Sequence, residues 1–504
     1  RCPPHPCHLP HLIRHNYHHH SRTTTTTTTA TPTAAGAAGA ALGLSLALAL
    51  ALALGPAADA RMMRVERSEE ELKVLHAANL KKSYSYCNDP VSKAQINFPD
   101  SLIGRVGTLE EAYSGYVNVT NEDWLFYEVF GSRSDMANDP VVFWTNGGPG
   151  CSSQEGTFTE IGPWNLFSIK EACTDTPNCD YSNQLSRNFY GWNAKATLVP
   201  VDQPRYVGYS FGYGDEIHSS VDAAADFVTF LQGWFELFPE FKGREMIVAG
   251  ESYGGHYVPA FVSAIMSYNE GVSAEEQFNL VGAVIGNGCV DDAVQDGSTY
   301  IDWAKEMDYL PAGANPKSQA IAQLQVYNNI GYTNNYYDAR LESVTCSACY
   351  GYNYTAWAEW LLRDDVLEAL NVCGEAGEDA FSGSAGGCIS LGAFDANDNF
   401  DYSAALADAL DAGISVTFYY GKQDTACNWV GGLDMANQLP WSQMSDFAAM
   451  DMEPLLLGGV EAGQYKQLGK LTFYAVESAG HMVPVDQGVA ASTAISTALS
   501  MVGA

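Results

Sequence analysis

The sequence predicts an α/β fold in which helices cover a mostly parallel sheet. Short apolar segments alternate with helical segments in the later part of the chain, as expected for strand–helix repeats. One apolar segment, 246–249, runs directly into Gly-Glu-Ser-Tyr-Gly at 250–254, where a strand would turn sharply into a helix. With 504 residues, the chain is long enough for one large domain of this class.

Strands are expected where a short run of β-branched and aromatic residues ends at a turn signal. These runs are 114–130, 140–145, 196–201, 245–249, 280–286, 414–420 and 471–476. Helices are expected at 219–238, 253–268, 364–371, 402–411 and 487–501. The segment from about 289 to 395 interrupts the alternation and is rich in Tyr, Asn, Gly and Cys. We expect it to form a lid or cap over the serine of the turn.

Ser252 is the candidate nucleophile, because it stands in the centre of the G-x-S-x-G pattern of a nucleophile elbow. Gly250 and Gly254 leave room where the backbones of strand and helix nearly touch. A chance turn of small residues would give the same five letters. The elbow hypothesis predicts more, namely that an acid and then a histidine follow, each just after a strand.

His481 is the best candidate for the base. Seven of the eleven histidines lie in the first 20 residues, which leaves four for the body of the chain. His256 lies four residues after Ser252, so it should sit on the helix that leaves the elbow and not face the hydroxyl. His481 follows the predicted strand 471–476 and lies in a loop.

Asp424 is the candidate acid, because it ends the strand-like segment 416–424. The order Ser252, Asp424, His481 is the order of α/β-hydrolases. A serine hydroxyl is a weak nucleophile until a neutral imidazole takes its proton, and a buried carboxylate then fixes the imidazole tautomer. The sequence therefore predicts an α/β-hydrolase fold with a serine nucleophile.

A glycine-rich loop follows the predicted strand 141–144. Its sequence is Thr-Asn-Gly-Gly-Pro-Gly-Cys-Ser-Ser at 145–153. Such a loop can aim backbone N–H groups at a developing oxyanion, where one donor is worth roughly 10²–10³ in rate. A plain tight loop is the alternative, since glycine and proline punctuate loops in general, but this string is long and particular.

The chain resembles the serine carboxypeptidases from about Asn97 to the C-terminus. The resemblance rests on several strings in the family's order: WTNGGPGCSS at 144–153, VDQP at 201–204 with GYS at 208–210, GESYGGHYVP at 250–259, IGNG at 285–288, DTACNW at 424–429 and GHMVP at 480–484.

The resemblance implies a role for each matched position. Ser252, Asp424 and His481 would form the catalytic triad. The backbone N–H groups of Gly148 and Tyr253 would form the oxyanion hole. The residues that would bind the substrate's terminal carboxylate, or lie beside it, are Asn146, Glu160, Glu251, Trp144 and Gly147.

Two of these positions, Glu160 and Glu251, are themselves acidic. A carboxylate that faces two ionised glutamates would be repelled, and like charges this close raise the pKa of one partner. We therefore expect both carboxyls to be protonated, so that they donate hydrogen bonds to the substrate. This predicts a hydrolase that binds peptides best at acidic pH. Without the resemblance, Glu251 would be interpreted as a solvated turn residue and Glu160 as a surface acid.

Three functions remain open at this point. The first is a serine-type carboxypeptidase that releases C-terminal amino acids through an acyl-enzyme, without metal or cofactor. The second is an acyltransferase of the same fold. Relatives of that kind often replace the asparagine and the glutamate that here are Asn146 and Glu251, so this chain favours the peptidase. The third is a non-catalytic binding or protective scaffold.

The chain departs from the family at Tyr206, where a glycine is common. This loop is expected to border the acyl-side pocket, so the family's preference at that pocket is not carried over. Ten cysteines follow residue 60, as in a bridged secretory protein. The resemblance suggests Cys346 as the partner of Cys151, and a free thiol at Cys427.

The first 86 residues are not expected to belong to the fold. Residues 1–33 are a low-complexity leader, 34–60 a signal peptide, 61–86 a possible propeptide and 87–504 the hydrolase domain. Asn118 and Asn353 begin possible glycosylation sequons. The net charge of −34 argues against nucleic acid and anionic membranes as partners. We expect a vacuolar, lysosomal or extracellular protein without a membrane anchor, which acts on peptides with a free C-terminus.

Overall fold

One large mixed sheet organises the computed structural model. The structure describes residues 90–103, 110–166, 184–215, 217–330, 335–341, 355–373, 388–389, 391, 394, 398 and 401–501. All of them belong to the unit Asp59–Ala504. The predicted leader and signal peptide lie outside the described residues, as do the predicted propeptide, Cys346 and Asn353.

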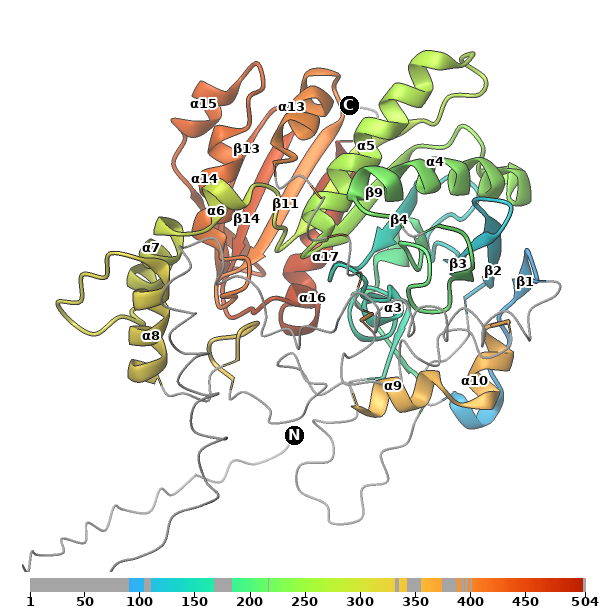
Figure 1. Cartoon of the computed structure of the whole chain (residues 1–504), viewed down its shortest axis with the longest axis horizontal. Coiled ribbons are helices and arrows are strands. Elements are labelled where there is room, and N and C mark those ends of the chain that lie inside the picture. The colour runs from blue at the N-terminus through green and yellow to red at the C-terminus, as the bar shows by residue number, and fades with distance from the viewer. Residues whose placement is uncertain are drawn as a thin grey trace, which may run out of the picture. The chain divides into compact units, whose positions relative to one another are not determined.

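Parallel strands form the centre of the sheet in the described part of the chain (Figure 1). In spatial order they are β7 (Thr197–Pro200), β4 (Val141–Thr145), β9 (Met246–Glu251), β10 (Leu280–Gly286), β11 (Ser415–Gly421) and β14 (Leu471–Val476). The pairing of β4 with β9 ends with Thr145 opposite Gly250, which brings the ends of the two strands together. The predicted α/β class with a mostly parallel sheet is confirmed.

Antiparallel strands complete both edges of the sheet. One edge carries β3 (Asp123–Phe130), β2 (Ala112–Asn118) and β1 (Ala94–Gln95), with β8 (Phe211–Gly212) paired to β3, and the other carries β13 (Val460–Leu468) and β12 (Glu453–Leu457). β5 (Trp164–Asn165) and β6 (Ser186–Arg187) form a separate ribbon. The prediction of one strand over 114–130 is wrong, because the chain turns after β2 and the Val119 N–H donates to the Asp123 carbonyl.

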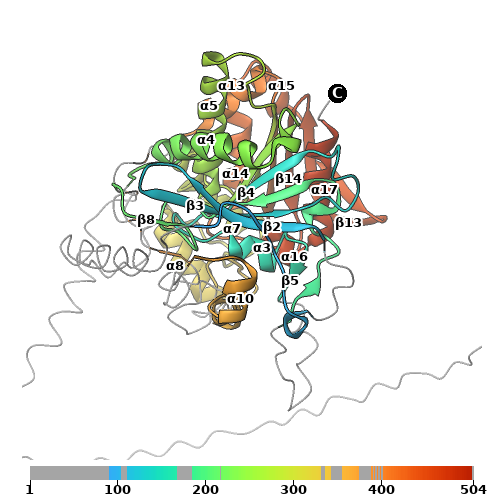
Figure 2. The ribbon, with the colours of Figure 1, turned by 90° about the vertical axis from the view of Figure 1, so that its right-hand side faces the viewer.

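Helices cover both faces of the sheet (Figure 2). Those that match predicted helices are α4 (Ser220–Leu237), α5 (Gly254–Gly271), α10 (Asp364–Ala369), α13 (Ser403–Asp411) and α17 (Gly488–Ser500). The others are α3 (Gln154–Thr159), α6 (Asp292–Gln295), α7 (Ser298–Glu306), α8 (Gln319–Ile330), α9 (Thr355–Leu361), α14 (Trp429–Gln438), α15 (Met444–Ala448) and α16 (Val483–Asp486). Short 3₁₀ helices span Asp100–Leu102, Trp192–Ala194 and Pro239–Phe241. None of the described helices is both long and apolar enough to cross a membrane.

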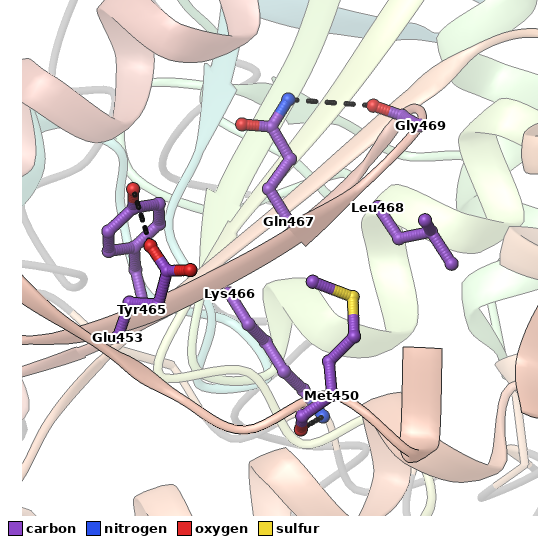
Figure 3. Close-up of a pocket in the computed structure, with 7 residues that line it drawn as sticks. All are labelled: Met450, Glu453, Tyr465, Lys466, Gln467, Leu468 and Gly469. Atoms are coloured by element: carbon purple, nitrogen blue, oxygen red, sulfur yellow. Dashed lines mark hydrogen bonds between the residues drawn. The ribbon is translucent and has the colours of Figure 1, made fainter. Parts of the chain in front are cut away.

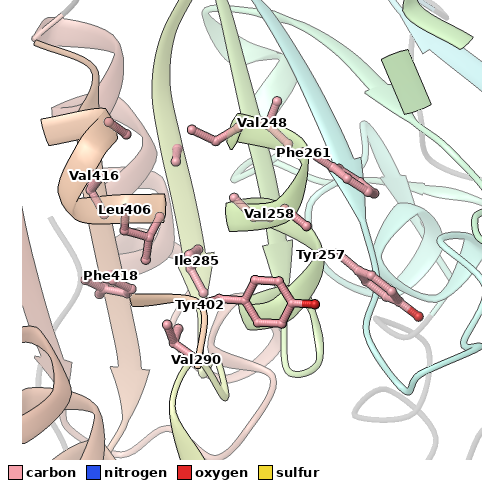
Figure 4. Close-up of a cluster of buried hydrophobic side chains, with 14 of the residues drawn as sticks. Val248, Tyr257, Val258, Phe261, Ile285, Val290, Tyr402, Leu406, Val416 and Phe418 are labelled. Carbon is pink, nitrogen blue, oxygen red and sulfur yellow. The ribbon is translucent and has the colours of Figure 1, made fainter. Parts of the chain in front are cut away.

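The strands are buried on both faces, because alternate side chains enter different cores. In β4, Val141 and Phe143 join the core beneath α4 and α5, whereas Val142 and Trp144 join the core beneath α17. Figure 4 shows the central part of the core beneath α4 and α5, where side chains of α5 and α13 pack on three neighbouring strands. This two-sided burial explains the near-continuous apolar runs of the parallel strands.

The described parts of the insertion at about 289–395 are mainly helical and include α6 to α10. In Figure 1, α8, α9 and α10 lie towards the same end of the strands as α3 and α16. The loops that follow the parallel strands open on the same side. The assignment of the insertion as a cap stays a prediction.

Candidate active site

Ser252 lies in a strained turn between β9 and α5. Its φ is 58°, in the left-handed region that residues other than glycine rarely adopt. Its N–H donates to the Gly286 carbonyl at 3.0 Å. A Cβ at Gly250 would lie 2.8 Å from the Thr145 carbonyl oxygen, so the turn has room only for glycine there. The predicted crowding at Gly254 is wrong, because the nearest atom to a Cβ there would lie 3.8 Å away. This is the strand–turn–helix geometry that the G-x-S-x-G pattern predicts.

Asp424 and His481 lie together at the ends of two neighbouring strands, β11 and β14. Oδ2 of Asp424 lies 2.6 Å from Nδ1 of His481. The same oxygen accepts from Nδ2 of Asn287 at 2.8 Å, and Oδ1 accepts from the Ala426 N–H at 2.8 Å. Asp424 is fully buried. This carboxylate is therefore held by several donors and can fix the orientation of the imidazole.

Asn287 connects this pair with the elbow. It follows Gly286, whose carbonyl receives the Ser252 N–H, and its own side chain binds Asp424. No hydrogen bond joins the Ser252 hydroxyl to His481 within the described residues. Such catalytic contacts often tighten only in the substrate complex. Asn287 was noted in the sequence only as part of the string at 285–288, and no role was predicted for it.

The glycine-rich loop packs directly against the elbow. A Cβ at Gly147 would lie 2.4 Å from the Tyr253 nitrogen and 2.8 Å from Cβ of Ser252. Gly148 has a φ of +116°. Within the described residues, neither the Gly148 N–H nor the Tyr253 N–H donates to a backbone carbonyl. The loop that carries the Gly148 N–H thus contacts the elbow through Gly147, and the Tyr253 N–H directly follows Ser252.

Asp202 anchors the far end of this loop. Its Oδ1 accepts from the Ser152 hydroxyl at 2.7 Å and from the Ser153 N–H at 2.8 Å. The Ser153 hydroxyl in turn accepts from the Asn146 N–H at 3.1 Å. Burial raises the pKa of Asp202 to about 6, although these hydrogen bonds oppose the rise. The sequence indicated Asp202 only as part of a family string.

Asn146 and Glu251 form one half of the predicted carboxylate-binding set. Nδ2 of Asn146 donates to Oε1 of Glu251 at 3.0 Å. Oδ1 of Asn146 accepts from Nε1 of Trp144 at 2.7 Å and from the Gly156 N–H at 3.1 Å. These two donors fix the amide so that its NH₂ group faces the glutamate. Trp144 and Asn146 are buried.

Glu160 and Glu251 are buried acids whose charges interact. Burial, helped by the nearby Glu155, raises the pKa of Glu160 to about 8. Burial and the neighbouring Glu160 raise the pKa of Glu251 well above its usual range. Both oxygens of Glu160 and Oε2 of Glu251 are buried and receive no hydrogen bond from another group in the described part of the chain, but the two carboxyls lie close enough to hydrogen-bond to each other. Protonated carboxyls in this position can donate to an incoming carboxylate. Glu155 is a third buried acid, which the sequence analysis did not identify.

Two cysteine expectations are wrong. Cys151 is bonded to Cys388 and not to Cys346. The Ile389 N–H donates to the Gly150 carbonyl at 2.9 Å, and this contact brings the two cysteines side by side. Cys427 is not a free thiol, because it forms a disulfide with Cys289.

His256 and Tyr206 lie outside the proposed triad. His256 is on α5, as expected, and its ring stacks on Tyr253 with centroids 4.3 Å apart. Burial lowers its pKa to about 4. Tyr206 adopts a φ of 73°, the conformation expected of the glycine it replaces. Its hydroxyl lies 3.0 Å from Oδ1 of Asp123 and 2.9 Å from the Gly214 carbonyl.

The hollow shown in Figure 3 is formed at the edge of the sheet, by residues other than those of the predicted site. Its lining residues are Met450, Glu453, Tyr465, Lys466, Gln467, Leu468 and Gly469. The Lys466 ammonium group donates to Oδ1 of Asn437 at 2.6 Å and to the Phe447 carbonyl at 3.0 Å. This amine is therefore held by acceptors, which gives it a structural role.

Similarity to known proteins covers most of the chain. A sequence model of the family described as serine carboxypeptidase matches residues 105–501. Serine carboxypeptidase 3 of Oryza sativa subsp. japonica is 32% identical over 408 residues, which cover 74% of this chain and 76% of that protein. Carboxypeptidase Y of Saccharomyces cerevisiae is 30% identical over 476 residues, which cover 84% and 83% of the two chains.

Solved structures share the fold. The prohormone-processing carboxypeptidase Kex1 of Saccharomyces cerevisiae matches with a TM-score of 0.63 and 21% identity, over 83% of this chain and 96% of that chain. At this identity the match concerns the fold alone. The predicted α/β-hydrolase fold is thereby confirmed.

Proposed function

Because the chain belongs to the serine carboxypeptidase family, we propose that Ser252, His481 and Asp424 release C-terminal amino acids from peptides through an acyl-enzyme. Nε2 of His481 takes the Ser252 proton as the hydroxyl oxygen attacks the scissile carbonyl. Asp424, which lies 2.6 Å from Nδ1, holds the ring and stabilises the imidazolium.

The N–H groups of Gly148 and Tyr253 are the proposed oxyanion hole. They lie where the glycine-rich loop meets the elbow, and they have no backbone acceptor within the described residues. Donors that are already in place stabilise the tetrahedral intermediate without reorganisation. The imidazolium of His481 then protonates the leaving amine, and water later hydrolyses the ester on Ser252.

The single observation that carries the choice of an exopeptidase is the buried pair Glu160 and Glu251. These carboxyls hydrogen-bond to each other and have raised pKa values, so in their protonated form they suit a ligand that accepts hydrogen bonds, and a free terminal carboxylate is such a ligand. Nδ2 of Asn146 donates to Oε1 of Glu251, and Trp144 and Gly147 lie next to this amide. An endopeptidase or esterase substrate has no free carboxylate that could accept hydrogen bonds from these acids.

Acidic pH is the proposed working range. Below the raised pKa values of Glu160 and Glu251 both carboxyls keep their protons and attract the substrate's carboxylate. As pH rises through about 8, Glu160 ionises and its charge repels the substrate's carboxylate. A vacuolar, lysosomal or extracellular location, reached through the secretory pathway, fits this pH range. The disulfides of the protein also agree with passage through the secretory pathway.

The test is release of the terminal amino acid from an N-blocked dipeptide between pH 4 and pH 8. The C-terminal amide of the same dipeptide and the Ser252→Ala variant serve as controls. We expect release at acidic pH that needs both Ser252 and the free carboxylate. Equal turnover of the amide would contradict the proposed role of Glu160 and Glu251. Acyl transfer to an alcohol without hydrolysis would favour an acyltransferase. Absence of any turnover by folded protein would favour a binding role.

A further inference from the structure

The disulfide Cys289–Cys427 connects two loops of the proposed active site. Cys289 lies in the loop after β10, and its N–H donates to the carbonyl of Ser252 at 3.1 Å. Cys427 lies in the loop after β11, and its N–H donates to Oδ2 of Asp424 at 3.3 Å. The bridge therefore joins Cys289, which hydrogen-bonds to the backbone of Ser252, to Cys427, which hydrogen-bonds to the side chain of Asp424.

The Cys289 end of the bridge is tightly packed against the elbow helix. A Cβ at Gly255 would lie 2.3 Å from the Cys289 carbonyl oxygen, so the loop touches the first turn of α5. Gly288 is also held in place, because its carbonyl accepts from Nε2 of Gln295 at 2.8 Å and from the Tyr420 hydroxyl at 2.6 Å. The position of Cys289 thus follows the position of Ser252.

The Cys427 end is fixed less strongly by hydrogen bonds near the acid. Its own N–H contact with Asp424 is long, at 3.3 Å, whereas the Ala426 N–H contact is 2.8 Å. The next residue, Asn428, caps α14 by accepting from the Gly431 N–H at 2.9 Å. The covalent bond to Cys289 adds to two hydrogen bonds that relate this loop to the segment after β10, from Nδ2 of Asn287 to Asp424 and from Nδ2 of Asn428 to the Gln295 carbonyl at 3.3 Å.

We propose that the Cys289–Cys427 disulfide is a positioning element of the active site, which keeps the acid loop in register with the nucleophile elbow. The proposal rests on the proposed function of Ser252 and Asp424. Misplacing a catalytic group by about 1 Å can cost up to roughly 10²-fold in rate. Loss of the bridge should therefore lower kcat while the carboxylate-binding set, which touches neither cysteine in the described structure, keeps KM near its wild-type value.

Thiol reagents give direct access to this bridge. A dithiol transfers two electrons and two protons, so the sulfur–sulfur bond breaks, the thiols of Cys289 and Cys427 form, and the reagent becomes a cyclic disulfide. Cys427 is buried and Cys289 is half-buried, so we expect reduction to enter through the Cys289 sulfur.

The experiment compares wild-type protein with the double variant Cys289→Ser/Cys427→Ser, each with and without dithiothreitol. We expect kcat of the double variant to fall about tenfold or more, with KM within about twofold. We also expect reduction to bring wild-type kcat to the level of the variant and to leave the variant unchanged. That last arm assigns the effect to this bridge, because the other disulfides are present in both proteins. Circular dichroism at the assay temperature confirms that both remain folded.

A substrate-independent readout separates this proposal from the proposed function. A fluorophosphonate probe that labels activated serines should modify Ser252 more slowly in the double variant than in the oxidised wild type. If the wild type reacts with the probe but releases no amino acid, the proposed function fails and the positioning role is still tested. Unchanged kcat and unchanged labelling in a folded double variant would overturn the positioning role.

Discussion

The hydroxyl of Tyr253 donates to the carboxylate of Asp398 at 2.6 Å, across 145 positions of the sequence. Asp398 is buried and also accepts from the Tyr402 hydroxyl at 2.5 Å and from the N–H and hydroxyl of Ser220 at 2.9 and 2.7 Å. One carboxylate thus ties together the starts of α4 and α13 and the residue whose N–H is proposed for the oxyanion hole. Charged acceptors make hydrogen bonds roughly twice as strong as neutral ones.

Asp398→Asn should therefore weaken the hold on Tyr253 and misalign its N–H. We expect kcat to fall about tenfold, since loss of a whole oxyanion donor costs roughly 10²–10³, with little change in KM. The matched control is Asp408→Asn, an exposed acid further along α13 that should leave kcat unchanged. Steady-state kinetics of both variants provide the measurement. A rise in KM with kcat preserved would show that Asp398 does not act through the oxyanion hole.

Asn287→Ala should lower kcat because it removes the side-chain N–H that holds Oδ2 of Asp424 at 2.8 Å. Leaving a buried acceptor with one donor fewer costs about 1–3 kcal/mol, so a tenfold or greater fall is expected. The control is Asn279→Ala, just before the opposite end of β10, where the exposed amide donates to the Gly243 carbonyl at 3.2 Å. Equal kcat for the Asn287 variant and wild type would show that the remaining donors are enough to orient the acid.

The pH dependence of substrate binding should follow Glu160 and Glu251. Their pKa values are raised, to about 8 for Glu160, so both carboxyls are protonated at low pH and Glu160 ionises as pH rises through about 8. KM for a peptide with a free carboxylate should therefore rise from pH 6 to pH 9. The double variant Glu160→Gln/Glu251→Gln keeps an N–H donor at each position but has no ionisable group there. Its KM should be nearly flat, and a wild-type KM that falls over this range would contradict the assignment.

Much of the fold was predictable because the parallel strands are buried on both faces and read as apolar runs. The elbow was also predictable, since its short distances leave room only for glycine beside Ser252. The hairpin β12–β13 was missed because β12 is a short leucine run directly after a proline and β13 is mostly polar, with few buried side chains in either strand. The expectation of a free thiol at Cys427 was wrong because its disulfide with Cys289 depends on β10 lying beside β11, an order that no local pattern contains.

The candidate site shows the same division between local and long-range information. Ser252, Asp424 and His481 each lie in a recognisable string after a strand, and the structure brings the latter two into contact. Asp398 lies in no such string. Three of its four side-chain hydrogen bonds come from Ser220 and Tyr253, which are distant in sequence, so only the folded chain reveals it.

Stability should fall as pH rises, because buried acids must give up protons in a place where their charge is poorly solvated. Glu128 is fully buried, and burial raises its pKa to about 8 from an ordinary value of 4.5. A group with a raised pKa in the folded state contributes stability that is complete below 4.5 and is lost as pH rises through about 8. We therefore expect the melting temperature to decline between pH 5 and pH 8.

Glu128→Gln tests this cause directly, because the amide fills the same space and its oxygen can still accept from Nε2 of Gln154, which now lies 3.0 Å from Oε2. Between pH 5 and pH 8 the melting temperature of the variant should fall by a few degrees less than that of wild type, as measured by differential scanning fluorimetry. Glu122→Gln, at an exposed position in the turn before β3, should follow the wild-type curve. If the Glu128 and Glu122 variants decline in parallel with wild type, Glu128 is ionised at little cost and another group controls the loss of stability.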